Sequence, residues 1–168
     1  MYFLALAMDF DGTIARDGVV DPPTLAALRR LRQTGRRLIL VTGRELPDLA
    51  SLLGDLGLFD RIVAENGALI CEPATGRERV IGSPAPAAFV RRLDALGVTP
   101  LSVGRAIVAT WEPCQGKVLK AIRDLGLELQ IIFNKGAVMV LPPGINKETG
   151  LRAALDELGL SINNTVGV

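Results

Sequence analysis

Three short apolar runs alternate with two helical segments in the first part of the chain, and this alternation restricts the fold more than any other feature. The runs at 2–8, 37–41 and 61–64 are each followed by polar residues, which is typical of buried strands in a parallel sheet. Leucines at helical spacing after Asp21, a predicted N-cap, indicate a helix between the first two runs, and a second helix is predicted at 45–56. This β-α-β-α-β order predicts an α/β fold with a Rossmann-like parallel sheet as its core.

A second block of the sequence has a different order of elements. Within 83–142 the predicted order is α-β-α-β-β, and a hairpin turn at 134–136 joins the last two strands. We therefore expect residues 1–82 and 143–168 to form the core domain, and 83–142 to form a small inserted α+β domain. Trp111 is expected in the hydrophobic core of that insertion.

The composition excludes several classes of function. The 168 residues are 49% hydrophobic and 22% charged, which indicates a soluble globular protein. A net charge of +1 gives no sign of a nucleic-acid or membrane-surface partner. Without histidine there is no Ser-His-Asp or Cys-His catalysis, and no zinc site is expected. The apolar start is too short to span a bilayer and lacks a signal-peptide pattern, so we expect a cytoplasmic protein. The sequence does not determine its oligomeric state.

Two like charges end the first predicted strand, in the sequence LALAMDFDGTIA at 4–15. Asp9 and Asp11 repel each other unless a positive group lies between them, and Mg²⁺ is a hard cation that binds such oxygens. One carboxylate of such a pair can attack phosphorus while the other protonates the leaving oxygen. Because the carboxyl ends of parallel strands meet at one edge of a sheet, Thr42 and Asn66 are expected near this pair.

Some of the candidate residues also have a purely structural interpretation. Thr42 alone is compatible with an N-cap of the following helix, and Lys147 with an ordinary surface lysine. Asn66 and Gly67 alone are compatible with a turn. The order of these residues along the chain is what favours a functional site.

Four segments resemble motifs of the haloacid dehalogenase superfamily of phosphohydrolases. MDFDGTIA resembles the first motif, LVTGR the second and INKETGL the third. AENGALI is similar to the Asn-Gly-Ala segment of the Cof-type group, subfamily IIB. That group also carries its cap domain between the second and third motifs, where the insertion at 83–142 falls. The resemblance implies an Mg²⁺-dependent phosphatase of a small phosphorylated metabolite, with the cap selecting the substrate.

The resemblance also implies a role for each acidic residue of the first motif. Asp9 would be the nucleophile that forms an aspartyl-phosphate. Asp11 would be the general acid and then the base for the hydrolytic water. Asp9 and the backbone carbonyl of Asp11 would bind Mg²⁺, so these two residues form the expected metal site.

The other motifs would supply the groups that bind phosphate. Thr42 and the amide of Gly43 would hold the phosphoryl oxygens, and Lys147 would supply positive charge. Arg44 and Asn66 are expected near the substrate.

The fourth motif of the family, G-D-x-x-x-D or G-D-x-x-N-D, is expected directly after the last predicted strand. The given sequence stops there, with NNTVGV at its end, and does not contain this motif. We therefore expect a fragment of a longer hydrolase with impaired activity. The alternative is a non-catalytic module that binds a phosphorylated ligand or a partner protein. A receiver-like phosphoacceptor is disfavoured, because the third strand ends in VAENG without an aspartate.

Overall fold

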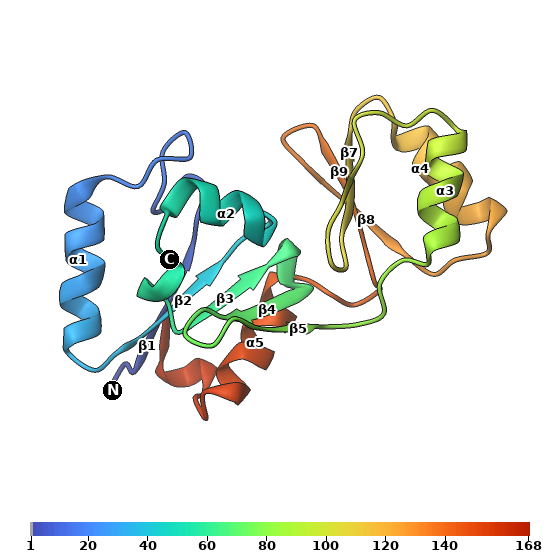
Figure 1. Cartoon of the computed structure of the whole chain (residues 1–168). Helices are drawn as coiled ribbons and strands as arrows, with labels where there is room; N and C mark the ends of the chain where they lie inside the picture. The colour runs from blue at the N-terminus through green and yellow to red at the C-terminus, as the bar shows by residue number, and fades with distance from the viewer. Residues whose placement is uncertain (1) are drawn as a thin grey trace. The chain divides into compact units, whose positions relative to one another are not determined.

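The computed structural model describes residues 2–168, and the chain divides into two compact units (Figure 1). The first unit runs to Arg79 and resumes with Asn146–Val168, and the second unit is Val80–Ile145. The predicted insertion at 83–142 lies inside the second unit, and its role as a cap domain stays a prediction. None of the helices within the described residues has the length and apolar character that crossing a membrane requires.

The first unit is built on a six-stranded sheet with the order β10-β1-β2-β3-β4-β5. Its strands are β1 (Ala5–Asp9), β2 (Arg37–Val41), β3 (Arg61–Ala64), β4 (Leu69–Glu72), β5 (Arg77–Val80) and β10 (Thr165–Gly167). Its helices are α1 (Pro22–Gln33), α2 (Leu46–Leu53) and α5 (Lys147–Glu157), with 3₁₀ turns η1 (Leu56–Leu58), η2 (Glu65–Gly67) and η3 (Ile162–Asn164). β1 pairs in parallel with β2 and β10, β2 pairs in parallel with β3, and β4 runs antiparallel to β3. The predicted α/β fold with a mostly parallel sheet is confirmed.

The ends of α1 follow from the local sequence. The side chain of Asp21 accepts a hydrogen bond of 2.7 Å from the backbone N–H of Thr24, so it is the predicted N-cap. Pro22 occupies the first helical position, where no backbone donor is needed. Gly35, just beyond the helix, has a φ of +82°, which glycine adopts without strain.

Helices cover both faces of the parallel strands. On one face, Leu38, Leu40 and Ile62 pack in a cluster with Leu28 of α1 and Leu49 of α2. Neighbouring residues along the strands point to the opposite face, which α5 covers through contacts with β3 and β4. Figure 1 shows α5 on a different side of this sheet from α1 and α2. Burial on both faces explains why the strands are continuous apolar runs rather than alternating patterns.

The register of the strands brings their carboxyl ends to a common edge. Asp9 pairs with Val41 across β1 and β2, and Val41 pairs with Val63 across β2 and β3. Asp9, Thr42 and η2 therefore follow one another along the same edge of the sheet, as the alternation of elements predicted.

An ion-pair network attaches the C-terminal end of α5 to the sheet. The guanidinium of Arg61, which is only 8% exposed, lies 2.8 Å from Glu157 and 3.0 Å from Glu72. Arg79 lies 2.7 Å from Glu157, and Arg77 lies 3.3 Å from Glu72. Burial raises the pKa of Glu157, but the hydrogen bonds from Arg61 and Arg79 lower it more, so the pKa lies below its usual value.

Replacing Glu157 with glutamine is expected to lower the free energy of unfolding by about 2 kcal/mol near neutral pH, below the range for fully buried pairs. A carboxylate with a depressed pKa stabilises the fold above the pKa of the unfolded glutamate. That contribution is lost as the pH falls through the lower, folded-state pKa. The difference between wild type and Glu157→Gln should therefore shrink in acid, measured by denaturant unfolding at a series of pH values.

The matched control for this prediction is Glu148→Gln, at the other end of α5. Glu148 is 68% exposed, and its ion-pair partner among the described residues is Arg152, one turn along the helix. Its loss is therefore expected to change stability by less than about 0.5 kcal/mol. A Glu157→Gln difference that stayed constant from neutral to acid pH would show that the charge of Glu157 is not what stabilises the fold.

The second unit packs two helices on one face of a four-stranded sheet with the order β6-β7-β9-β8. Its elements are α3 (Ala87–Ala95), β6 (Ser102–Val103), β7 (Val108–Trp111), α4 (Gln115–Asp124), β8 (Gln130–Asn134) and β9 (Ala137–Leu141). Phe89, Leu93 and Val118 of the helices pack against Val108 and Val140 of the strands.

The expectation for Trp111 was wrong, because its side chain is 53% exposed. Successive residues of a strand point to opposite faces. In β7, Val108 and Thr110 are buried, whereas Ala109 is only partly buried and Trp111 is exposed. The alternation therefore places Trp111 on the face that α3 and α4 do not cover.

Candidate active site

Asp9 ends β1 and forms an ion pair with Lys147. The Nζ atom of Lys147 lies 2.8 Å from Oδ1 of Asp9, although 138 positions separate the two residues in the sequence. Lys147 is the first residue of α5, so the start of this helix is directed to the carboxyl edge of the sheet. The backbone N–H of Asp9 donates to the carbonyl of Val168, which ties the end of β1 to the neighbouring β10 segment.

Asp11 forms a bidentate ion pair with Arg44. Nε and Nη2 of Arg44 donate to the two carboxylate oxygens of Asp11, each at 2.8 Å. The guanidinium also lies 5.6 Å from the centre of the Phe10 ring, within the range of a cation–π contact. The hydrogen bond to Asp11 raises the pKa of Arg44. Arg44 is thus fixed beside Asp11 by geometry and by charge.

Thr42 is fully buried directly after β2. Its hydroxyl oxygen accepts a hydrogen bond of 3.1 Å from the backbone N–H of Arg44, so its own O–H remains a donor. The N-cap of α2 is Glu45, which shows that Thr42 does not cap this helix. Gly43 lies between Thr42 and Arg44 in the loop that leads to α2.

Asn66 lies in the buried turn η2, next to Thr42. Its backbone N–H donates to the carbonyl of Thr42 at 3.0 Å, and Asn66 is 8% exposed. The turn has positive φ values at Glu65, Asn66 and Gly67, of 50°, 57° and 106°. The turn interpretation of Asn66 and Gly67 therefore describes their backbone, while their position puts them beside the candidate site.

Two residues next to Lys147 in the structure were not identified from the sequence. Asn146 caps α5 and forms a capping box with Thr149, and its signal is the Asn-x-x-Thr spacing just before the helix. Gly150 lies inside the helix, where glycine is unfavourable by about 1 kcal/mol relative to alanine. An isolated glycine in a helical pattern is itself a sign of close packing.

The carboxylates fit the ligand chemistry of Mg²⁺, which proteins commonly bind through one or two carboxylates together with waters and substrate phosphates. Lys147 contacts Oδ1 of Asp9, so the second oxygen of Asp9 can take a cation without loss of this ion pair. Within residues 2–168, no three or more His, Cys, Asp or Glu side chains are grouped so that they could hold a metal ion. Further ligands would be backbone oxygens such as the carbonyl of Asp11, waters and the substrate.

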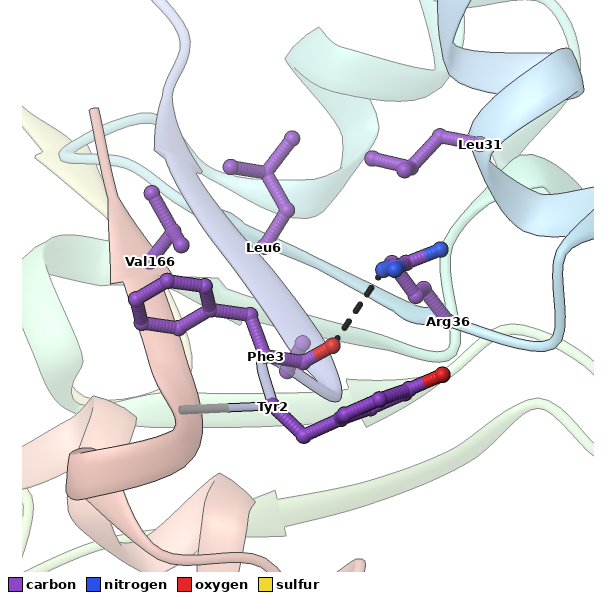
Figure 2. A pocket seen from close by; sticks show the side chains of 7 residues that line it. Tyr2, Phe3, Leu6, Leu31, Arg36 and Val166 are labelled. Atoms are coloured by element: carbon purple, nitrogen blue, oxygen red, sulfur yellow. Dashed lines mark hydrogen bonds between the residues drawn. The ribbon is translucent and has the colours of Figure 1, made fainter.

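A separate pocket lies at the opposite end of β1 from Asp9 (Figure 2). Its volume is about 460 Å³, and Tyr2, Leu6, Leu31 and Val166 contribute to its mostly apolar lining. The Nε atom of Arg36 donates to the carbonyl of Phe3 at its rim. The pocket contains none of the predicted site residues, so the candidate chemistry lies at the other edge of the sheet.

Comparisons with known proteins give one family model and several similar phosphatases. Residues 6–92 match the family model described as haloacid dehalogenase-like hydrolase. A phosphoglycolate phosphatase of Aeropyrum pernix is 29% identical over 174 residues, which cover 96% of this chain and 71% of that protein. An HMP-PP phosphatase of Yersinia pestis is 38% identical over 73 residues, which cover 43% of this chain and 26% of that protein. The solved structure of a HAD subclass IIB sugar phosphatase shares the fold, with a TM-score of 0.72 at 17% identity over 97% of this chain and 79% of that chain.

Proposed function

Because this chain belongs to the haloacid dehalogenase-like hydrolases, we propose that it is a phosphatase that acts on a small phosphorylated metabolite through an aspartyl-phosphate on Asp9. The observation that supports this best is the ion pair between Asp9 and Lys147. Asp9 is the last residue of the buried strand β1 and lies two positions before Asp11. A carboxylate held beside an ammonium group has the charge and the fixed position that attack on a phosphate dianion requires.

The first step of the proposed reaction is transfer of the phosphoryl group to Asp9. A carboxylate oxygen of Asp9 forms a bond to phosphorus as the bond from phosphorus to the leaving oxygen breaks. Asp11 gives its proton to that oxygen, which departs as an alcohol. Lys147 offsets the negative charge that Asp9 and the phosphate bring together.

The second step is hydrolysis of the aspartyl-phosphate. A water molecule attacks phosphorus, Asp11 takes up its proton, and the bond from phosphorus to Asp9 breaks. Inorganic phosphate leaves, and Asp11 is protonated again for the next cycle. Bound Mg²⁺, held by Asp9 and the carbonyl of Asp11, would neutralise charge on the phosphoryl oxygens in both steps.

The other residues bind the phosphoryl group and control Asp11. In the proposed reaction, the O–H of Thr42 and the N–H of Gly43 donate to phosphoryl oxygens. A proton on Asp11 competes with the two N–H donors of Arg44, so Arg44 has to release Asp11 before Asp11 acts as an acid. The phosphate of an incoming substrate offers Arg44 an alternative partner.

The test is release of inorganic phosphate from 2-phosphoglycolate and from p-nitrophenyl phosphate. 2-Phosphoglycolate is chosen because the similar protein of Aeropyrum pernix is a phosphoglycolate phosphatase. We expect turnover with Mg²⁺, loss of turnover with excess EDTA, and recovery when Mg²⁺ is added back. Beryllofluoride, a mimic of the acyl-phosphate, is expected to raise the melting temperature in the presence of Mg²⁺.

The two alternatives from the sequence give different results in this test. A melting-temperature shift with beryllofluoride but no phosphate release would favour a non-catalytic phosphate-binding module. Turnover well below that of the Aeropyrum enzyme under the same conditions would agree with impaired activity, and comparable turnover would contradict it. If the protein showed no phosphate release and no melting-temperature shift, this result would count against the proposed function.

A further inference from the structure

The backbone of the turn η2 lies directly against the backbone of the first turn of α5. Gly67 has a φ of +106°, and a Cβ atom at this position would overlap the carbonyl group of Asn146 and lie 3.0 Å from the amide nitrogen of Lys147. On the helix side, a Cβ atom on Gly150 would lie 2.6 Å from the Cα and the carbonyl oxygen of Gly67, and 2.6 Å from Cγ1 of Val63 in β3. No side chain separates the two segments at this point.

This contact determines where α5 begins relative to the sheet. The carbonyl of Asn146 that faces Gly67 also accepts the hydrogen bond from the N–H of Gly150 within α5, at 3.0 Å. The same carbonyl thus contacts the turn and closes the first turn of the helix. Lys147 follows Asn146 immediately, so any group inserted between Gly67 and this carbonyl displaces the backbone that supports the lysine.

We propose that Gly67 and Gly150 are positioning residues whose backbone contact holds the Lys147 ammonium on the carboxylate of Asp9. The inference depends on the proposed function only for its consequence in catalysis. The ion pair spans 2.8 Å, and a displacement of about 1 Å in such a site can reduce a rate roughly 100-fold.

Other interactions also hold the two ends of α5. The capping box of Asn146 and Thr149 satisfies the start of the helix, and Glu157 binds Arg61 and Arg79 at its end. A wedge at Gly67 is therefore expected to tilt the Lys147 end of α5 outward while the Glu157 end stays in place.

The direct test is zero-length carbodiimide cross-linking, which joins an amine to a carboxylate only when they are in contact. The Lys147–Asp9 product is measured by mass spectrometry as a ratio to the Lys120–Asp124 product, because that exposed pair on α4, at 3.3 Å, serves as internal reference. We expect Gly67→Ala to lower this ratio several-fold. Gly76→Ala is the matched control, because Gly76 also has a positive φ, +71°, but open space around it.

A second pair of variants adds a methyl group from the helix side, against the backbone of Gly67 and the side chain of Val63. Gly150→Ala introduces no positive-φ strain and favours the helix by about 1 kcal/mol, so loss of the cross-link would not reflect melting of α5. Its control is Gly116→Ala, at a helical glycine of α4 with open space around it. This pair decides the matter if Gly67→Ala does not fold.

The cross-link and the phosphatase assay separate the two proposals. Loss of the Lys147–Asp9 product in Gly67→Ala or Gly150→Ala, with a fall in kcat of roughly tenfold or more, supports both. Loss of the product when even the wild type releases no phosphate supports the positioning role and contradicts the phosphatase. An unchanged ratio in folded Gly150→Ala, or no Lys147–Asp9 product in the wild type, overturns the positioning role.

Discussion

Asp9→Asn is expected to reduce phosphate release by at least about 10⁴-fold, because an amide cannot form the covalent intermediate. Asparagine keeps the size of the side chain, and the ion pair that it removes is partly exposed, at 38% for Asp9 and 40% for Lys147. Such pairs contribute only about 0–1 kcal/mol to stability, so the variant should remain folded. Phosphate release with Mg²⁺ and either substrate gives the rate. The melting-temperature shift with beryllofluoride should be lost as well.

The control for Asp9→Asn is Asp17→Asn. Asp17 is exposed in the turn that follows the first motif and has a φ of +52°, a conformation that asparagine tolerates as well as aspartate. This variant should hydrolyse phosphate esters at the wild-type rate. If Asp9→Asn retained turnover, Asp9 could not be the nucleophile, and the acidic pair at the strand end would need a different role.

The location of the acidic pair could be predicted from the sequence because it depends on strand direction alone. Once the three apolar runs are taken as parallel strands, Asp9 and Thr42 must lie at the same edge of the sheet. In the structure Asp9 pairs with Val41, the residue just before Thr42, which agrees with this prediction. The partners of the acids depend on side-chain reach across the fold. Nothing local to Asp11 indicates that Arg44 binds both of its oxygens.

Elements without a hydrophobic pattern were the ones that could not be predicted. β5 has the sequence RERV and is exposed along its whole length, so neither alternation nor an apolar run marks it. β6 has only two residues, both exposed. Arg79 of β5 nevertheless pairs with Glu157, 78 positions later in the chain. Pairing over such a sequence separation leaves no periodic signal.

The role of Gly150 shows a different limit of sequence analysis. Its helix was predicted from the pattern that starts near Lys147, and α5 does begin at Lys147. A glycine inside this helix is locally unfavourable, and its reason becomes visible only when Gly67, 83 positions earlier, is found against it. Local rules fail here at a contact between two backbones that supports the candidate site.

Lys147→Met is expected to lower phosphate release by about 10²–10³-fold, the range seen when one group that stabilises transition-state charge is removed. Methionine is similar in length and favours helices, so the substitution removes the charge and leaves the first position of α5 occupied. Without the ammonium group, less positive charge offsets the repulsion between the carboxylate of Asp9 and the phosphate dianion. Both beryllofluoride binding and turnover should therefore weaken.

Lys120→Met is the control, because Lys120 is an exposed lysine of α4 that pairs with Asp124 one turn along the helix. It should hydrolyse 2-phosphoglycolate and p-nitrophenyl phosphate at the wild-type rate. Turnover of Lys147→Met within a few-fold of wild type would mean that the Asp9–Lys147 ion pair only supports the fold. A large loss in Lys147→Met with an unchanged melting temperature would agree with a role of the ammonium charge in catalysis.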